Sequence, residues 1–68
     1  MSVKLVVTAT SGHQQISWPE NLDRAITIAH TKMTRHARGI REIKIMVNGG
    51  KKPVKRWRAY IQWREVGS

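Results

Sequence analysis

The sequence predicts an α+β fold, in which one helix packs on a three-stranded antiparallel sheet in the order strand, helix, strand, strand. Two observations lead to this prediction. Apolar residues with helical spacing follow a helix-start pattern in "SWPENLDRAITIAH", residues 17–30. Runs of apolar and β-branched residues with strand character precede and follow that segment, and an Asn-Gly step typical of a hairpin separates the last two.

Residues 3–10, "VKLVVTAT", predict the first strand. Val3, Leu5 and Val7 alternate on one face, while Val6 and Thr8 occupy the other. A strand that is apolar on both faces is typically buried on both, so we expect this one to be buried on both sides. Residues 11–16, "SGHQQI", predict a polar connection without secondary structure.

The helix is expected over residues 18–38. Ser17 and Glu20 have the S-x-x-E spacing of a capping box, and Gly39 is a common helix stop. Five apolar residues form one stripe along it: Leu22, Ala25, Ile26, Ala29 and Met33. This stripe predicts the face that packs on the sheet.

Residues 40–47, "IREIKIMV", alternate and predict the second strand, with Ile43, Ile45 and Val47 on the core face. "NGGKKP" predicts the hairpin turn. Residues 54–66 predict one long last strand. One face of it carries Trp57, Ala59, Ile61 and Trp63, and the other carries Arg56, Arg58, Tyr60, Gln62 and Arg64.

A chain of 68 residues has room for one domain, residues 1–68, and a domain of this size buries a small core. It has no cysteine for disulfides, and His13, His30 and His36 are too scattered for a structural zinc site. We therefore expect a homo-oligomer, in which a second copy covers the tryptophans that one helix bearing Ala25 and Ala29 leaves exposed.

Charge is the strongest compositional feature, because 13 Lys and Arg residues face 4 Asp and Glu residues, giving a net charge of +9. Such a surface attracts nucleic acid, anionic lipid or phosphorylated small molecules, or it is simply a solvated surface. No apolar run has the length of a membrane span, and no signal-peptide pattern is visible. The sequence thus predicts a cytoplasmic protein without a membrane partner.

Material for catalysis is sparse. There is no cysteine nucleophile and no carboxylate pair at a workable spacing, and His30 and His36 are six residues apart and do not share a helix face. We predict no enzymatic activity, no catalytic residue and no metal site. "NGGKK" lacks the spacing of a phosphate-binding glycine loop and is better explained as a turn.

The candidate ligand-binding site is the polar face of the last strand: Arg56, Arg58, Tyr60, Gln62 and Arg64. Cations beside a tyrosine on a sheet surface can hold phosphates and stack a base, although salt-bridged arginines facing solvent would give the same pattern. A secondary anion-binding set comprises Arg35, Arg38, Arg41, Lys51 and Lys52. Trp57 and Trp63 are better explained as packing residues than as platforms on which a base stacks, while both explanations suit Trp18.

Several short motifs together resemble the dodecins, a family of small β-α-β-β proteins. They are Ala9-Thr10-Ser11 after the first strand, Ser17, Trp18 and Glu20 at the helix start, Ala25, Ile26 and Ala29 within it, Arg35-His36 near its end, and Trp57 in the last strand. The resemblance covers most of the chain. It implies a hollow shell of twelve subunits that binds a flavin. At the positions of the flavin-stacking tryptophan and the flavin-contacting glutamine, this chain has Gly39 or Ile40 and Arg58.

Two functions follow as hypotheses. The first is a non-enzymatic, oligomeric binding or storage protein of the dodecin-like type, which takes an anionic small molecule such as a nucleotide or a flavin on the basic strand face. The alternative is a nucleic-acid-binding module that uses the same face.

Overall fold

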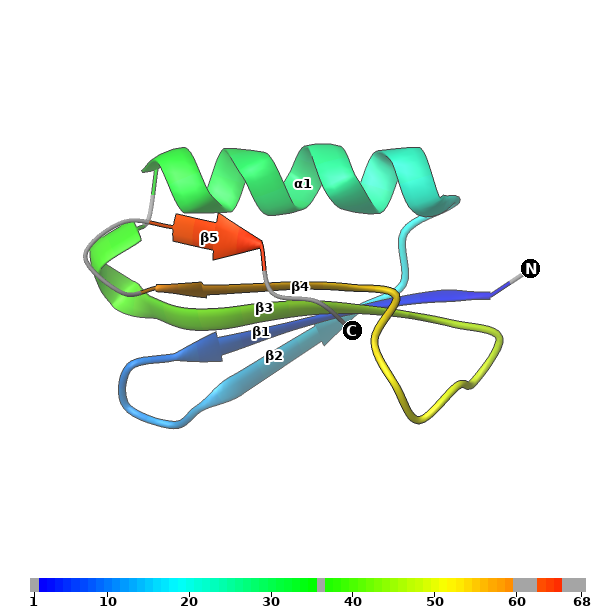
Figure 1. Ribbon diagram of the computed structural model, residues 1–68, viewed down its shortest axis with the longest axis horizontal. Helices are drawn as coiled ribbons and strands as arrows, with labels where there is room; N and C mark the ends of the chain where they lie inside the picture. The colour runs from blue at the N-terminus through cyan, green and yellow to red at the C-terminus, as the bar shows by residue number, and fades with distance from the viewer. Residues whose placement is uncertain (1, 36, 60–62, 66–68) are drawn as a thin grey trace.

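The computed structural model describes residues 2–35, 37–59 and 63–65. It has one α-helix, α1 (Leu22–Arg35), one short 3-10 helix, η1 (Ala37–Gly39), and strands β1 (Val3–Ala9), β2 (Gln14–Ser17), β3 (Ile40–Val47), β4 (Lys55–Ala59) and β5 (Trp63–Glu65). The strands form one antiparallel sheet in the order β2-β1-β3-β4-β5, and α1 lies on one face of it (Figure 1). The α+β class is thus confirmed, but the sheet has five strands where three were predicted.

The polar connection predicted over residues 11–16 is wrong, because most of it belongs to a β-hairpin. Gly12, with φ of +93°, turns the chain, and the amide of Ala9 donates to the carbonyl of His13 at 2.8 Å. β2 then pairs with β1, with Ile16 opposite Val6. All four residues of β2 are exposed, so no burial pattern marks this edge strand in the sequence.

The predicted helix start is also wrong. Ser17 is the last residue of β2, paired with Leu5, and is therefore unable to serve as the helix cap. Asn21 takes that role, since its Oδ1 accepts a hydrogen bond from the amide of Arg24 at 2.8 Å. The α-helix ends at Arg35 rather than at residue 38, and η1 continues the chain to Gly39.

The long last strand predicted over residues 54–66 is two strands, β4 and β5, which pair antiparallel with Ala59 opposite Trp63. The sequence from Arg56 to Arg64 alternates without interruption, so its pattern gives no sign of the reversal. The Asn-Gly turn before β4 is confirmed: Asn48 and Gly49 have φ of 57° and 69°, and the amide of Gly50 donates to Val47 at 3.0 Å.

The core lies between α1 and the central strands. Ala25, Ala29 and Met33 of α1 are buried on this face of the sheet. The sheet contributes seven buried residues: Val3, Leu5, Val7, Ile40, Ile43, Ile45 and Trp57. A register shift between Thr8 and Ala9 of β1 leaves Arg41 without a partner there, so that Ile40 and Ile43, three residues apart, both reach the core.

The two candidate caps can be separated by mutation. Asn21→Ala is expected to lower the free energy of unfolding by about 1 kcal/mol, because the amide of Arg24 loses its acceptor. Ser17→Ala, which would be equally costly in a capping box, should change it by less than half as much. Urea unfolding followed by circular dichroism measures both, and an equal loss for the two variants would contradict the observed helix start.

Candidate functional site

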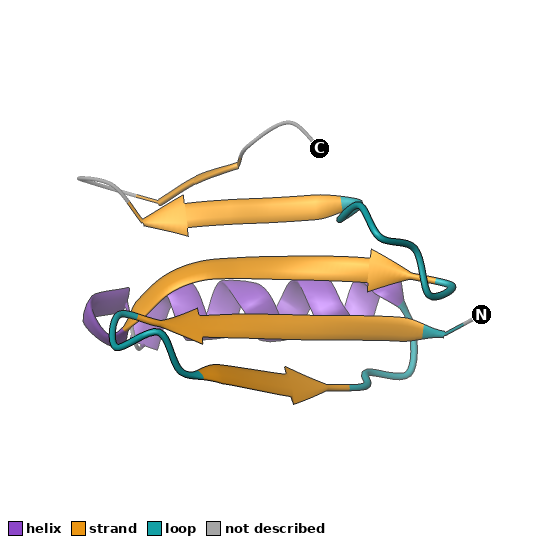
Figure 2. Cartoon of the chain, turned by 90° about the horizontal axis from the view of Figure 1, so that it is seen from below, coloured by secondary structure: helices purple, strands orange, loops and turns teal. Residues whose placement is uncertain are grey.

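The face of the sheet opposite α1 is the candidate site, and we call it the open face. Figure 2 views the sheet from this side, with α1 behind β1 and β3. Residues that alternate with the core positions lie on it. The register arranges them in rows across β2, β1, β3 and β4. One row is Ile16, Val6, Lys44 and Arg56, and the next is Gln14, Thr8, Glu42 and Arg58.

The centre of the open face is closely packed although no described segment lies over it. Val6 is 3% exposed and Thr8 is 4% exposed, so β1 is buried on both faces, as the sequence predicted. Their neighbours in the register are longer side chains, Ile16 and Gln14 on one side and Lys44 and Glu42 on the other. The surface offered to a partner is therefore made by the long side chains around this centre.

Glu42 organises the cations of this face. Its Oε2 accepts a hydrogen bond from Arg58 Nε at 2.8 Å. Lys44 Nζ lies 3.8 Å from its Oε1, and Arg56 Nε lies 4.0 Å from its Oε2. One carboxylate, only 17% exposed, thus holds Arg58 by a hydrogen bond, forms longer ion pairs with Lys44 and Arg56, and leaves an excess of positive charge.

The partly buried position of the Arg56 side chain costs free energy. Its Nε is buried and has no hydrogen-bond partner within the described part of the chain. Burying a donor without an acceptor costs about 1–3 kcal/mol. The ion pair with Glu42 offsets part of this cost, and an anion bound to the guanidinium would add a second source of favourable electrostatic energy.

The corner of the open face diagonally opposite Arg58 carries an aromatic ring. Trp18, just after β2, is 68% exposed, and the ammonium of Lys4 lies 5.9 Å from its ring centroid. This is a cation–π arrangement, and the outer surface of the indole stays available to a second planar group. The sequence analysis missed Lys4 and Lys44 as site residues, although their alternation with core positions of β1 and β3 assigns both to this face.

The predicted site residues are brought together only in part. Arg56 and Arg58 lie on the open face and form ion pairs with Glu42, as the salt-bridge explanation predicts, and anion binding by them stays a prediction. Arg64 lies opposite Arg58 in the backbone register. Tyr60 and Gln62 lie outside the described residues, as does the side chain of Arg64.

The secondary set is spread along the chain. Arg35, Arg38 and Arg41 are exposed at the end of α1, in η1 and at the bulge of β3, and Arg41 lines a hollow of about 500 Å3 with Glu42 and Arg58. Lys51 and Lys52 are exposed in the connection between β3 and β4. The structure thus places Arg41 next to the open face.

Comparisons of the chain with protein-family models, with curated proteins and with solved structures gave no match. Within residues 2–35, 37–59 and 63–65 no three His, Cys, Asp or Glu side chains are grouped so as to hold a metal ion. No described helix has the length and apolar character needed to cross a membrane.

The role assigned to Glu42 predicts a salt-dependent stability change. Glu42→Gln should lower the free energy of unfolding by about 1 kcal/mol at low salt, because Lys44, Arg56 and Arg58 then repel one another without a carboxylate between them. The loss should shrink in high salt, where this repulsion is screened. Denaturant unfolding at two salt concentrations measures the effect.

Glu65→Gln is the matched control, because Glu65 is half exposed and, among the described residues, forms an ion pair with Lys55 alone, at 2.9 Å. It should change the free energy of unfolding by less than about 0.5 kcal/mol. An equal loss of unfolding free energy for the two variants, or a Glu42→Gln loss that salt does not change, would contradict the role assigned to Glu42.

Proposed function

We propose that this chain is a non-enzymatic nucleic-acid-binding module that holds a single strand on the open face of its sheet. The observation that supports it best is the combination of cations and an exposed ring on one surface. Lys44, Arg56 and Arg58 of β3 and β4 surround the carboxylate of Glu42, and Lys4 of β1 lies beside the exposed ring of Trp18 at the edge. Phosphates bind the cations, and a base stacks on the indole.

The shape of the open face favours an extended polyanion over the small anionic molecule of the first hypothesis. Neighbouring strands are about 4.8 Å apart, so cations on β1, β3 and β4 span roughly 10 Å across the sheet. Trp18 at one corner and Arg58 at the other lie on opposite sides of this band. A strand of nucleic acid can contact both corners, whereas a small molecule reaches only one.

Binding to a fluorescent single-stranded oligonucleotide tests this proposal. Three or four phosphate contacts predict that the logarithm of the association constant falls with the logarithm of salt with a slope of about −2 to −3. Replacing Lys4 and Lys44 together by Gln should reduce the size of this slope by about 1.4, since two contacts are lost. Fluorescence anisotropy over a salt series gives both values.

Two controls separate charge from stacking. Arg24→Gln with Arg35→Gln removes the same charge from exposed positions of α1, on the other side of the sheet, and should leave the slope unchanged. Trp18→Ala should weaken binding about tenfold at every salt concentration, whereas Ile16→Ala should have little effect. A slope near zero, or equal slopes for the sheet and helix pairs, would contradict the proposal.

A dodecin-like assembly is the second candidate. It is favoured by β1, α1, β3 and β4, which follow one another in the β-α-β-β order that the resemblance implies, with β2 inserted before the helix and β5 added after β4. Exposed Ile16 and Trp18 offer apolar surface for contacts between copies. Light scattering on the purified protein should then give a mass of twelve subunits with flavin absorbance on the same peak. A monomer without that absorbance would exclude the dodecin-like assembly.

A further inference from the structure

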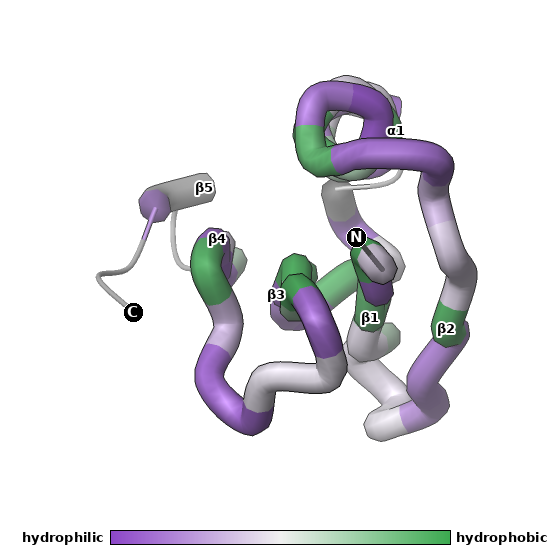
Figure 3. Tube along the Cα trace, turned by 90° about the vertical axis from the view of Figure 1, so that its right-hand side faces the viewer, coloured by the Kyte–Doolittle hydropathy of each residue, from purple (hydrophilic) through white to green (hydrophobic). Residues whose placement is uncertain are grey.

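A second recess lies on the helix side of the sheet, away from the open face. α1 contacts β1 and β3, and β2 lies beyond its flank (Figure 3). The helix-facing side of β2 is therefore uncovered, and its residues are exposed. A cavity of about 400 Å3 lies here, between β1 and β2 on one side and α1 and η1 on the other.

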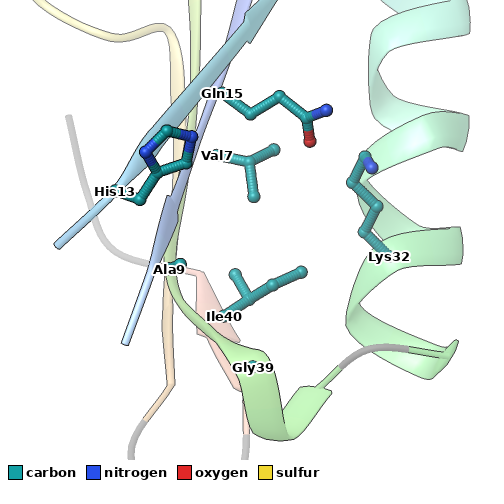
Figure 4. Close-up of a pocket in the computed structure, with 7 residues that line it drawn as sticks. All are labelled: Val7, Ala9, His13, Gln15, Lys32, Gly39 and Ile40. Carbon is teal, nitrogen blue, oxygen red and sulfur yellow. The ribbon is translucent and has the colours of Figure 1, made fainter. Parts of the chain in front are cut away.

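The lining of this cavity divides into an apolar part and a polar rim. Val7 and Ile40 are buried core residues, and with Ala9 they form the apolar part. His13, Gln15 and Lys32 contribute the polar groups, and Gly39 completes the lining. Figure 4 shows the side chains of Gln15 and Lys32 extending toward each other from β2 and α1 across the apolar side chains of Val7 and Ile40.

The polar groups of the rim are free to bind. Within the described part of the chain, the side chains of His13, Gln15 and Lys32 have neither a hydrogen bond nor an ion pair. Lys32 is half-buried, so its apolar stem covers the cavity wall while its ammonium stays at the rim. An ammonium, an amide and an imidazole supply hydrogen-bond donors, and no carboxylate is among the lining residues.

We infer that this cleft binds a small organic anion, with a compact apolar or single-ring body and one carboxylate or phosphate group. The body packs on Val7 and Ile40, and the oxyanion receives hydrogen bonds from Lys32 and Gln15. The volume is at the small end of the range of about 300–1,000 Å3 for small-molecule sites, which favours one ring over a dinucleotide. This inference does not rest on the proposed nucleic-acid function.

Nuclear magnetic resonance titration tests the inference with three probes of similar size: benzoate, phenyl phosphate and neutral benzyl alcohol. Benzoate or phenyl phosphate should shift the methyl signals of Val7 and Ile40 in a saturable manner, and the tighter of the two identifies the oxyanion. Benzyl alcohol should bind at least about tenfold more weakly, because it lacks the charge that Lys32 recognises.

Lys32→Gln should weaken binding of the anion by about tenfold or more, while Lys32→Arg should retain most of it. Arg35→Gln is the matched control, since it removes a charge three residues later on α1 from a position that does not line the cleft. The amide spectrum of each variant reports its fold. Equal binding of benzyl alcohol, an unchanged affinity of Lys32→Gln, or shifts confined to the open face would overturn the inference.

Discussion

One helix has to cover a sheet of five strands, and most features of this protein depend on that mismatch. A helix is about 10 Å wide and strands are about 4.8 Å apart, so α1 covers two to three strands. Ala25 and Ala29 are fully buried, and their small side chains let α1 approach β1 and β3 closely. Trp57 on β4 packs at the flank of the helix, with His30 at 5.7 Å between ring centroids, and is 5% exposed. A single chain therefore buries Trp57, whereas Trp18 is exposed, and its coverage by a second copy stays a prediction.

Because α1 lies on one face of the sheet (Figure 2), the other face is covered by the side chains of the sheet itself. Val6 and Thr8 are buried there among longer neighbours from β2 and β3, although no segment of the described residues lies over them. One of those neighbours is the cation Lys44, and the carboxylate of Glu42 beside it forms ion pairs with Lys44 and with Arg56 and Arg58 of the next strand, β4. Preorganised cations lose less side-chain freedom when a phosphate binds, so a network that stabilises the fold modestly also favours binding.

Strong periodic patterns allowed much of this structure to be predicted. β1, β3 and the core face of α1 follow from alternating or helically spaced apolar residues, and Asn48-Gly49 marks its turn. β2 has no such pattern, because an edge strand with four exposed residues is held by backbone pairing to β1. Ser17 illustrates a second limit: its local capping pattern was overridden by pairing with Leu5. Arg56 and Arg58 were assigned to a common polar face correctly, but Lys4 and Trp18 come near each other only through the β1–β2 hairpin.

The two proposed sites differ in the physical origin of their affinity. On the open face, a polyanion exchanges its condensed counterions for protein cations, and the gain diminishes as salt is added. In the cleft, apolar contact with Val7 and Ile40 supplies part of the binding energy, and that part is insensitive to moderate salt. Lys32 contributes a single charge there, against four cations on the open face. Salt dependence therefore distinguishes the two sites even for a ligand such as a nucleotide, which has both a phosphate and a ring.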